Sequence, residues 1–252
     1  MTYWCEFLAH IDGGKAIKID ILNTSYTFFS KKNIFGEKNI NYNQFSVQDV
    51  LKNKYVEEFE NQIKNFRKID SIYFSFEPIL KYDLSFSNAF KILKKNNYNH
   101  YIDMSLIIDL TKNESQLFKN IRTNYKAPIK KEILDLNLKI VDSKSIINEK
   151  YVFDDWISSY SNAINKGNKV LSKKAYEALA LSVKNSEVII FCAYQNNQFL
   201  GGNLFSIFND IPSYSLGVVS YNEAQNNQRY VSHYLMWQSI LYFKKKSFLN
   251  IE

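Results

Sequence analysis

The sequence predicts an α+β fold in two halves, with mixed, mostly antiparallel sheets flanked by helices. Strand-like apolar runs and segments with helical spacing are interleaved along the whole chain. Its 252 residues suffice for one large hydrophobic core or two small ones. The order hairpin, third strand, helix, strand occurs from Tyr3 to Pro78 and again from Glu187 to Glu252. An internal structural repeat explains this order, and a chance similarity of two α+β halves is the alternative.

The first half has the predicted order βββαβα. Two apolar runs at 3–11 and 15–22 are joined around Gly13 and Gly14, and paired glycines are typical of a β-hairpin. Ser46 is the expected N-cap of the helix that follows the third strand. The remaining elements are a third strand at 25–32, this helix at 46–70, a strand at 71–77 ended by Pro78 and a helix at 87–96.

The second half begins with a strand at 105–110. Thr111 is the expected N-cap of a helix at 112–126, with Glu114 completing a capping box, and Pro128 is expected to interrupt that helix. The remaining predicted elements are a strand at 138–143, helices at 150–165 and 173–184 joined at Gly167, strands at 187–195, 198–208 and 212–220, and a closing helix followed by a strand at 248–252.

Composition favours a cytoplasmic protein with an anionic partner. The 32 basic and 25 acidic residues give a net charge of +7, which suits phosphates, tRNA or a membrane surface, although the charges lie in short scattered clusters that also fit solvated faces. Cys5 and Cys192 lie in apolar runs, as buried free thiols of a reducing compartment do. No secretory leader or membrane-spanning run is apparent, and peripheral membrane contact stays open.

The sequence does not contain the motifs of several common catalytic and ligand-binding chemistries. The three histidines at 10, 100 and 233 have no metal-ligand spacing, so we expect no metal. The sequence also has no nucleophile elbow, no P-loop and no Gly-x-Gly-x-x-Gly.

The second half resembles the FemABX-related, GNAT-like acyltransferases, which include the peptidoglycan-bridge aminoacyltransferases. The resemblance rests on the order of three segments: SLIIDLTKNESQLFKNIRTNYKAPIKKEILDLNLKIVDS, FCAYQNNQFLGGNLFSIF and YSLGVVSYNEAQNNQRYVSHYLMWQSILYFKKKSF. It implies tandem GNAT-like modules, a partial one at 1–104 and an acyltransferase module at 105–252. The second module stops at FLNIE, before the last helix and strands of a complete module, so we expect a truncated chain.

The resemblance also implies an acyl-donor site where the strand before the closing helix diverges from its neighbour. The first turn of that helix has free N–H groups and partial positive charge, which attract phosphates. The GNAT signature Gln/Arg-x-x-Gly-x-Gly/Ala is replaced by QRYVSH, without glycine, which favours an aminoacyl-tRNA donor over acyl-CoA. The expected donor-binding residues are Leu216, Gly217, Val218, Gln228, Arg229 and Ser232. Alternatively, these residues have no role in donor binding: Gln228 and Arg229 are solvated loop residues and Ser232 is a helix cap.

Amine attack on a thioester or ester needs a group that handles a proton. The candidates are His233, Glu252 and Tyr214; an ordinary structural role is the alternative for each. By resemblance, the basic segment with Arg122, Lys126 and Lys130 binds an anionic acceptor or tRNA, and ordinary helix surface is its alternative. Lys244 to Lys246 are expected to complement a helix C-terminus.

These expectations predict an acyltransferase. It would move an acyl or aminoacyl group from acyl-CoA or aminoacyl-tRNA, acting as co-substrate, to an amine of a cell-envelope precursor or amino sugar. The alternative function is a catalytically degenerate GNAT scaffold that binds nucleic acid or a protein partner.

Overall fold

The computed structural model divides the chain into two compact units, Met1–Leu106 and Ile107–Glu252, here called unit 1 and unit 2. Both have an α+β fold. The structure describes residues 2–11, 14–21, 24–32, 38–45, 47–52, 54–64, 71–76, 84–99, 106–132, 136–165, 171–220 and 228–251.

Unit 1 is built on a four-stranded sheet in the order β1-β2-β3-β4. The first three strands pair antiparallel, and β4 pairs parallel with β3. Phe28 and Phe59 lie in one buried cluster and their rings are in contact. The elements are α1 (Thr2–Ile11), β1 (Lys15–Ile21), β2 (Thr24–Lys32), β3 (Lys38–Phe45), α2 (Val47–Leu51), α3 (Tyr55–Lys64), β4 (Ser71–Phe76) and α4 (Leu84–Lys95).

The predicted first strand of unit 1 is wrong, because residues 2–11 form the helix α1. A short apolar run does not by itself distinguish a buried helix from a strand. The Gly14 N–H donates to the Ala9 carbonyl at 2.7 Å, so this glycine closes the end of a helix rather than a hairpin. Gly13 lies outside the described residues.

Two further predictions for unit 1 need correction. The Asn-rich strand β3 was not predicted, because its composition is typical of loops. The predicted helix at 46–70 is two helices, α2 and α3, separated at Lys54, whose φ is 64°. Positive φ is incompatible with a continuous helix. Ser46, Pro78 and the end of the predicted helix at 65–70 lie outside the described residues. The helix α4 and the strands β2 and β4 are confirmed.

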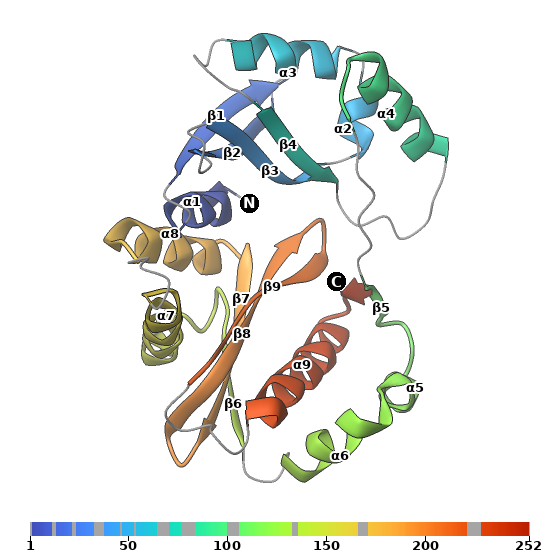
Figure 1. Cartoon of the computed structure of the whole chain (residues 1–252). Coiled ribbons are helices and arrows are strands. Elements are labelled where there is room, and N and C mark those ends of the chain that lie inside the picture. The colour runs from blue at the N-terminus through green and yellow to red at the C-terminus, as the bar shows by residue number, and fades with distance from the viewer. Residues whose placement is uncertain are drawn as a thin grey trace. The chain divides into compact units, whose positions relative to one another are not determined.

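Unit 2 is built on an antiparallel sheet in the order β6-β7-β8-β9, with β5 and β10 paired separately. The helices α7 and α8 cover one face of the sheet and α9 covers the other, with α5 and α6 packed outside it (Figure 1). The elements are β5 (Ile108–Asp109), α5 (Glu114–Asn120), α6 (Thr123–Glu132), β6 (Asn137–Val141), α7 (Lys150–Asn165), α8 (Lys173–Lys184), β7 (Val188–Gln195), β8 (Gln198–Phe208), β9 (Ile211–Val219), α9 (Gln228–Lys245) and β10 (Asn250–Ile251).

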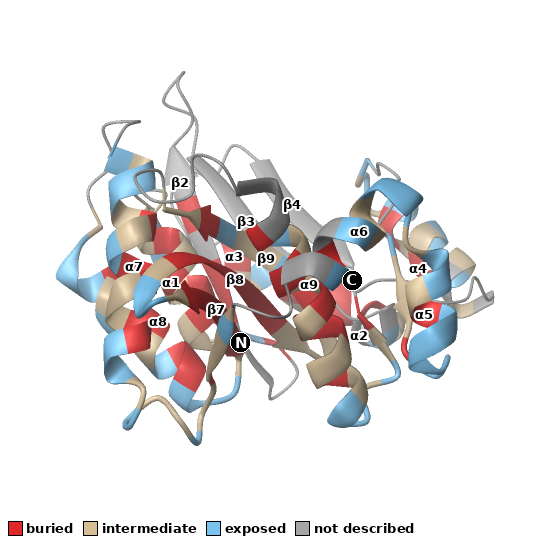
Figure 2. Ribbon diagram, turned by 90° about the horizontal axis from the view of Figure 1, so that it is seen from below, coloured by how far each residue is buried: buried red, intermediate tan, exposed pale blue. Residues whose placement is uncertain are grey.

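The centre of unit 2 is buried on both faces of the sheet. Strand β7 is buried from Val188 to Tyr194, and α9 has buried residues at intervals from Val231 to Phe243 (Figure 2). The strands are joined by tight turns at 196–197 and 209–210, where all four residues have φ between 48° and 64°. These are the dihedrals of a type I′ hairpin turn, which Asn and Asp tolerate well. The predicted hairpin at 196–197 is confirmed.

The predicted helices at 150–165 and 173–184 are confirmed as α7 and α8, and the closing helix is confirmed as α9. The joint at Gly167 lies outside the described residues. Pro128 does not interrupt a helix, because it lies inside α6; the chain breaks instead at Ile121, between α5 and α6. The N-cap of α5 is Asn113 rather than Thr111.

Candidate functional site

The candidate functional site lies at the outer edge of β9. Among the described residues, β9 pairs with β8 alone, and β10 pairs with β5 instead of β9. Backbone N–H and C=O groups at an unpaired edge need other partners. The outer edge of β9 is therefore a candidate place for a ligand that binds backbone groups.

A β-bulge shapes this edge. The register shifts so that Leu204 pairs with Leu216 and Phe205 with Tyr214, which leaves Ser215 as the extra residue. The Ser215 hydroxyl is 2.8 Å from that of Ser206 and donates to the Ser213 carbonyl at 3.2 Å. A bulge re-aims the neighbouring side chain.

The Tyr214 side chain folds over Gly217. A Cβ added at Gly217 would overlap the Tyr214 hydroxyl and would lie 3.3 Å from Asn203 Oδ1. The Tyr214 ring makes an edge contact with Phe205, with centroids 5.6 Å apart. Tyr214 is 46% exposed, so its hydroxyl is held near the sheet but remains open to solvent on one side. Burial raises the pKa of Tyr214, which keeps the hydroxyl protonated, and therefore a hydrogen-bond donor, at neutral pH.

Asn203 is a polar residue at this site that was not predicted from the sequence. It pairs with Gly217 in the β8–β9 ladder and is only 5% exposed. Successive side chains of a strand alternate between faces, and Gly201 and Phe205 both face α9 through Val231 and Phe243. The Asn203 side chain therefore lies on the face of the sheet that α9 covers. Its signal in the sequence is one amide side chain in the otherwise mostly apolar run LGGNLFSIF.

The start of α9 packs directly on β8 and β9. Val231 Cγ1 would lie 3.3 Å from a Cβ at Gly201, so the absence of that side chain allows the helix to approach. Ser232 is exposed and lies inside α9, which begins at Gln228; it is therefore not the helix cap. Gln228 and Arg229 belong to the first turn of α9; their side chains lie outside the described structure.

The other predicted donor-binding residues lie on β9 itself. Leu216 is half-buried, Gly217 is exposed and Val218 is buried. Their backbone lies on the edge of β9 that pairs with no other described strand. The candidate Glu252 lies outside the described residues, as do residues 221–227 before α9.

His233 is not brought next to Tyr214. Its ring stacks on Tyr125 of α6, with centroids 4.2 Å apart. His233 follows Val231 by two residues, and two residues of a helix turn through about 200°, so it points away from the sheet on which Val231 packs. Its Nδ1 atom is buried and has no hydrogen-bond partner among the described residues.

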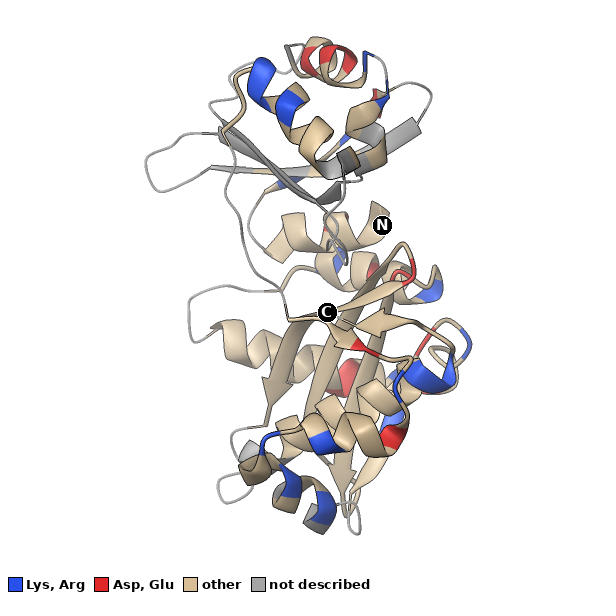
Figure 3. Ribbon diagram, turned by 90° about the vertical axis from the view of Figure 1, so that its right-hand side faces the viewer, with Lys and Arg blue, Asp and Glu red and all other residues tan. Residues whose placement is uncertain are grey.

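The predicted acceptor-binding residues lie around the break between α5 and α6, where Figure 3 shows several basic positions. The Lys126 ammonium donates to the Lys119 carbonyl at 2.8 Å and lies 6.0 Å from the Phe118 ring centroid. Lys130 lies over the same ring at 5.5 Å. Arg122 is exposed. The Tyr125–His233 contact places this basic segment beside the first turns of α9.

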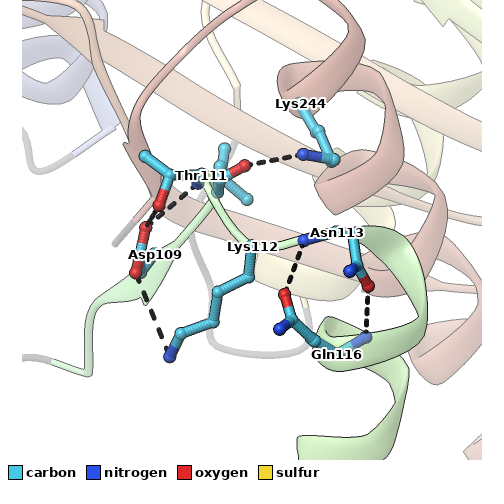
Figure 4. Close-up of polar contacts among 7 residues, drawn as sticks. Asp109, Thr111, Lys112, Asn113, Gln116 and Lys244 are labelled. Carbon is cyan, nitrogen blue, oxygen red and sulfur yellow. Dashed lines mark hydrogen bonds and ion pairs between the residues drawn. The ribbon is translucent and has the colours of Figure 1, made fainter.

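A hydrogen-bonded turn holds the β5 end of unit 2 (Figure 4). Asp109 Oδ1 accepts from the backbone N–H and the hydroxyl of Thr111 at 3.0 and 2.6 Å, which explains why Thr111 does not cap α5. The Thr111 hydroxyl bond holds the pKa of Asp109 below its usual value. Asn113 and Gln116 form the capping box, and Lys244 donates to the Leu110 carbonyl at 2.9 Å. This last bond fixes the C-terminal end of α9 to the chain beside β5.

Neither a metal cluster nor a membrane-spanning helix is present in the described ranges. No group of three or more His, Cys, Asp or Glu side chains suited to a metal ion occurs there. In the same ranges no helix is both long and apolar enough to cross a membrane.

The divergent edge of β9, the bulge and the helix that starts beside them agree with a FemABX-related, GNAT-like fold. No family model matches the sequence, and no curated protein sequence matches it. Solved structures do match. FemX superimposes with a TM-score of 0.65 at 11% identity, over 100% of this chain and 81% of that chain. The chain therefore shares the fold of FemX.

Two further structures share this fold. The C-terminal domain of a protein described as lysylphosphatidylglycerol synthetase from Agrobacterium fabrum has a TM-score of 0.62 at 7% identity, over 99% of this chain and 72% of that chain. L-PGS from Bacillus licheniformis has a TM-score of 0.55 at 9% identity, over 94% of this chain and 67% of that chain. At these identities the likeness establishes the fold and leaves the chemistry to be argued from the residues.

Proposed function

We propose that this protein is an acyltransferase. It transfers an acyl or aminoacyl group from acyl-CoA or aminoacyl-tRNA to an amine of a cell-envelope precursor, such as a peptidoglycan precursor, or of an amino sugar. The observation that carries the proposal is the unpaired edge of β9 at Gly217, beside the first turn of α9. In this arrangement the backbone of β9 holds the acyl arm, and the helix start attracts the phosphates of the donor.

In the proposed reaction the amine nitrogen attacks the carbonyl carbon of the donor. A C–N bond forms, and the C–S bond of a thioester or the C–O bond of a tRNA ester breaks. The amine sheds one proton, and the leaving sulfur or oxygen takes one up, so no oxidant or reductant is needed. Tyr214 is the side chain that we assign to the reacting group, because its protonated hydroxyl lies over Gly217 on the unpaired edge.

Two features favour an aminoacyl-tRNA as donor over acyl-CoA. No glycine follows Gln228 in the first turns of α9, and Val231 fills the space above Gly201, so the helix start has no bare backbone for close contact with a pyrophosphate. The basic segment at Arg122, Lys126 and Lys130 lies beside this helix start, where it would meet a tRNA backbone. Cys5 and Cys192 are buried and form no disulfide within the described residues, which supports a cytoplasmic location.

Isothermal titration calorimetry tests the proposal. The full chain is titrated with acetyl-CoA and, separately, with total tRNA charged with amino acids. We expect saturable binding of one donor, the charged tRNA on the reasoning above, and weaker binding of the same tRNA after deacylation. Failure of both donors to bind would contradict the proposal.

Two substitutions distinguish the proposed enzyme from the alternative function, which is a protein that binds nucleic acid without catalysis. Arg229→Ala at the start of α9 and Arg122→Ala on the basic segment are compared with wild type over a range of salt concentrations. In an enzyme, Arg229→Ala weakens the binding of charged tRNA more than that of deacylated tRNA, whereas Arg122→Ala weakens both equally through the tRNA backbone. In a nucleic-acid scaffold both lower the dependence of log affinity on log salt concentration, by about one unit for each phosphate that the arginine no longer neutralises.

A further inference from the structure

We infer that Asn203 binds the carbonyl oxygen of the acyl group, together with the Tyr214 hydroxyl. This inference rests on the proposed function and extends it to a residue outside the predicted site. It makes Asn203 a catalytic residue, because its amide would touch the reacting group.

The position of Asn203 is unusual for a polar side chain. It lies on a strand whose residues from Leu200 to Ser206 are buried, and it faces the layer of α9. Its neighbours on the same face of β8 are Gly201 and Phe205, which offer it no polar side-chain atom. The Asn203 amide is not among the fully buried polar atoms of the described residues that lack a partner, so part of it reaches solvent and can meet a ligand.

The polar groups nearest this position belong to β9. Asn203 Oδ1 and the Tyr214 hydroxyl both converge on the point where a side chain at residue 217 would begin. Because residue 217 is glycine, the Tyr214 hydroxyl lies in the space that a Cβ would take. Tyr214 is half-exposed and Asn203 is buried, so a ligand on the edge of β9 would reach the amide beside the phenol, over the exposed backbone of Gly217.

The chemistry of the pair suits a carbonyl. The amide presents its oxygen toward Gly217, and rotation by 180° about the Cβ–Cγ bond presents its NH₂ group instead with the same outline. The amide NH₂ and the phenol O–H are then two neutral donors aimed at one point. Neutral donors match a carbonyl oxygen, whereas a phosphate or carboxylate favours charged partners.

This pair would act at the point where charge develops. When the amine attacks, the carbonyl π electrons move onto oxygen, which becomes negatively charged until the C–S or C–O bond breaks. Two donors held beside the sheet would stabilise that oxygen. Removal of one such donor typically lowers the rate of acyl transfer about 10²–10³-fold.

The test observes the carbonyl directly. Carbon-13 is placed at the carbonyl of acetyl-CoA and of the amino acids charged onto total tRNA, and the donor that binds wild type is followed by NMR. We expect the bound carbonyl resonance to move downfield, because hydrogen bonds polarise the C=O bond. Asn203→Leu and Tyr214→Phe should each remove part of this shift, while the donor affinity falls by no more than about tenfold.

The controls separate this role from a structural one. Ser182→Ala removes another buried hydroxyl of unit 2, one that donates to the Ala178 carbonyl inside α8, and should leave the carbonyl shift unchanged. If Asn203→Leu does not fold, Asn203→Ser carries the same expectation, because its hydroxyl is too short to replace the amide. An unchanged shift in the folded Asn203 variant would overturn the inference while donor binding upholds the proposed function. Failure of both donors to bind wild type would overturn both.

Discussion

At the scale of single residues, two glycines of unit 2 differ in what surrounds them. A Cβ at Gly202 would meet Trp156 Cδ1 at 2.5 Å and the Phe191 carbonyl at 2.9 Å. Trp156 is fully buried between α7 and the sheet, so it has no space into which to move. At Gly217 the obstructing atom belongs to the half-exposed side chain of Tyr214.

We therefore predict opposite consequences for two alanine substitutions. Gly202→Ala should lower the free energy of unfolding by about 1–3 kcal/mol, as overpacking of a core does. Gly217→Ala should change stability by less than about 0.5 kcal/mol but should displace Tyr214 and lower donor turnover. Chemical denaturation measures the first effect, and release of free CoA or tRNA measures the second. Equal losses of stability would show that Tyr214 cannot move aside.

A second prediction at this scale concerns Asp142, which follows β6. Its Oδ1 accepts from the Lys144 and Ser145 backbone N–H groups and from the Ser145 hydroxyl, and Oδ2 accepts from the Tyr242 hydroxyl at 3.1 Å. Burial by itself would raise the pKa of Asp142, but these bonds outweigh it and the pKa is lowered. Burial first, and then the Asp142 charge, raise the pKa of Tyr242 to about 12.

The sign of the pH effect follows from the lowered pKa of Asp142. A carboxylate with a depressed folded pKa stabilises the protein above its unfolded pKa, and that stability is lost as pH falls through the folded pKa. Asp142→Asn should therefore lower the free energy of unfolding by about 1–3 kcal/mol at pH 7, and the difference from wild type should shrink below about pH 4. Urea titrations at pH 7 and below pH 4 measure it; Lys150→Met, at an exposed ion pair with Asp154, is the control.

At the scale of elements, α5 shows how tertiary contacts determine which residue caps the N-terminus of a helix. Thr111 and Glu114 satisfy the sequence pattern of a capping box, yet Asn113 and Gln116 form it. The Thr111 hydroxyl is already bonded to Asp109, at the turn that Lys244 ties to α9. Two overlapping patterns were available in the sequence, and the turn after β5 decided between them.

This arrangement predicts that the two residues differ in their effect on stability. Asn113→Ala should cost about 1 kcal/mol of unfolding free energy, the usual loss for an N-cap. Thr111→Ala should cost less, since the bond that it breaks is exposed. Thermal unfolding followed by circular dichroism compares the two variants. A larger loss for Thr111→Ala would contradict the assignment of the cap.

At the scale of the whole molecule, each unit has a buried cluster of its own. The cluster of unit 1 includes Phe28 and Phe59, and that of unit 2 includes Phe191, Phe205 and Phe243. The division into tandem modules at 1–104 and 105–252 remains a proposal; the two compact units divide after Leu106.

We predict that residues 107–252 fold without the rest of the chain. The fragment should show a cooperative thermal transition and a dispersed NMR spectrum, because its sheet, α7, α8 and α9 bury their apolar faces on one another. The matched comparison is the full chain under the same conditions. A fragment without a cooperative transition would mean that unit 2 depends on unit 1 and would argue against independent modules.

The sequence by itself determined the α+β class and most elements of unit 2. The strands β7 and β8 are long apolar runs joined by Asn-Asn, and α7 and α8 have clear helical spacing, so local signals were sufficient. Unit 1 was predicted less well, since the run at 2–11 suits a helix or a strand and β3 has the composition of a loop.

Only the tertiary structure decided which candidate residues meet. The sequence offered His233 and Tyr214 on equal terms, but the rotation of α9 turns His233 toward Tyr125, while the bulge at Ser215 places Tyr214 over Gly217. It also brought Asn203 to the same point from the neighbouring strand. Periodicity along the chain fixes which face a residue occupies within its own element. The register between strands and the packing of a helix on a sheet depend on contacts between distant segments, and these decide what each face meets.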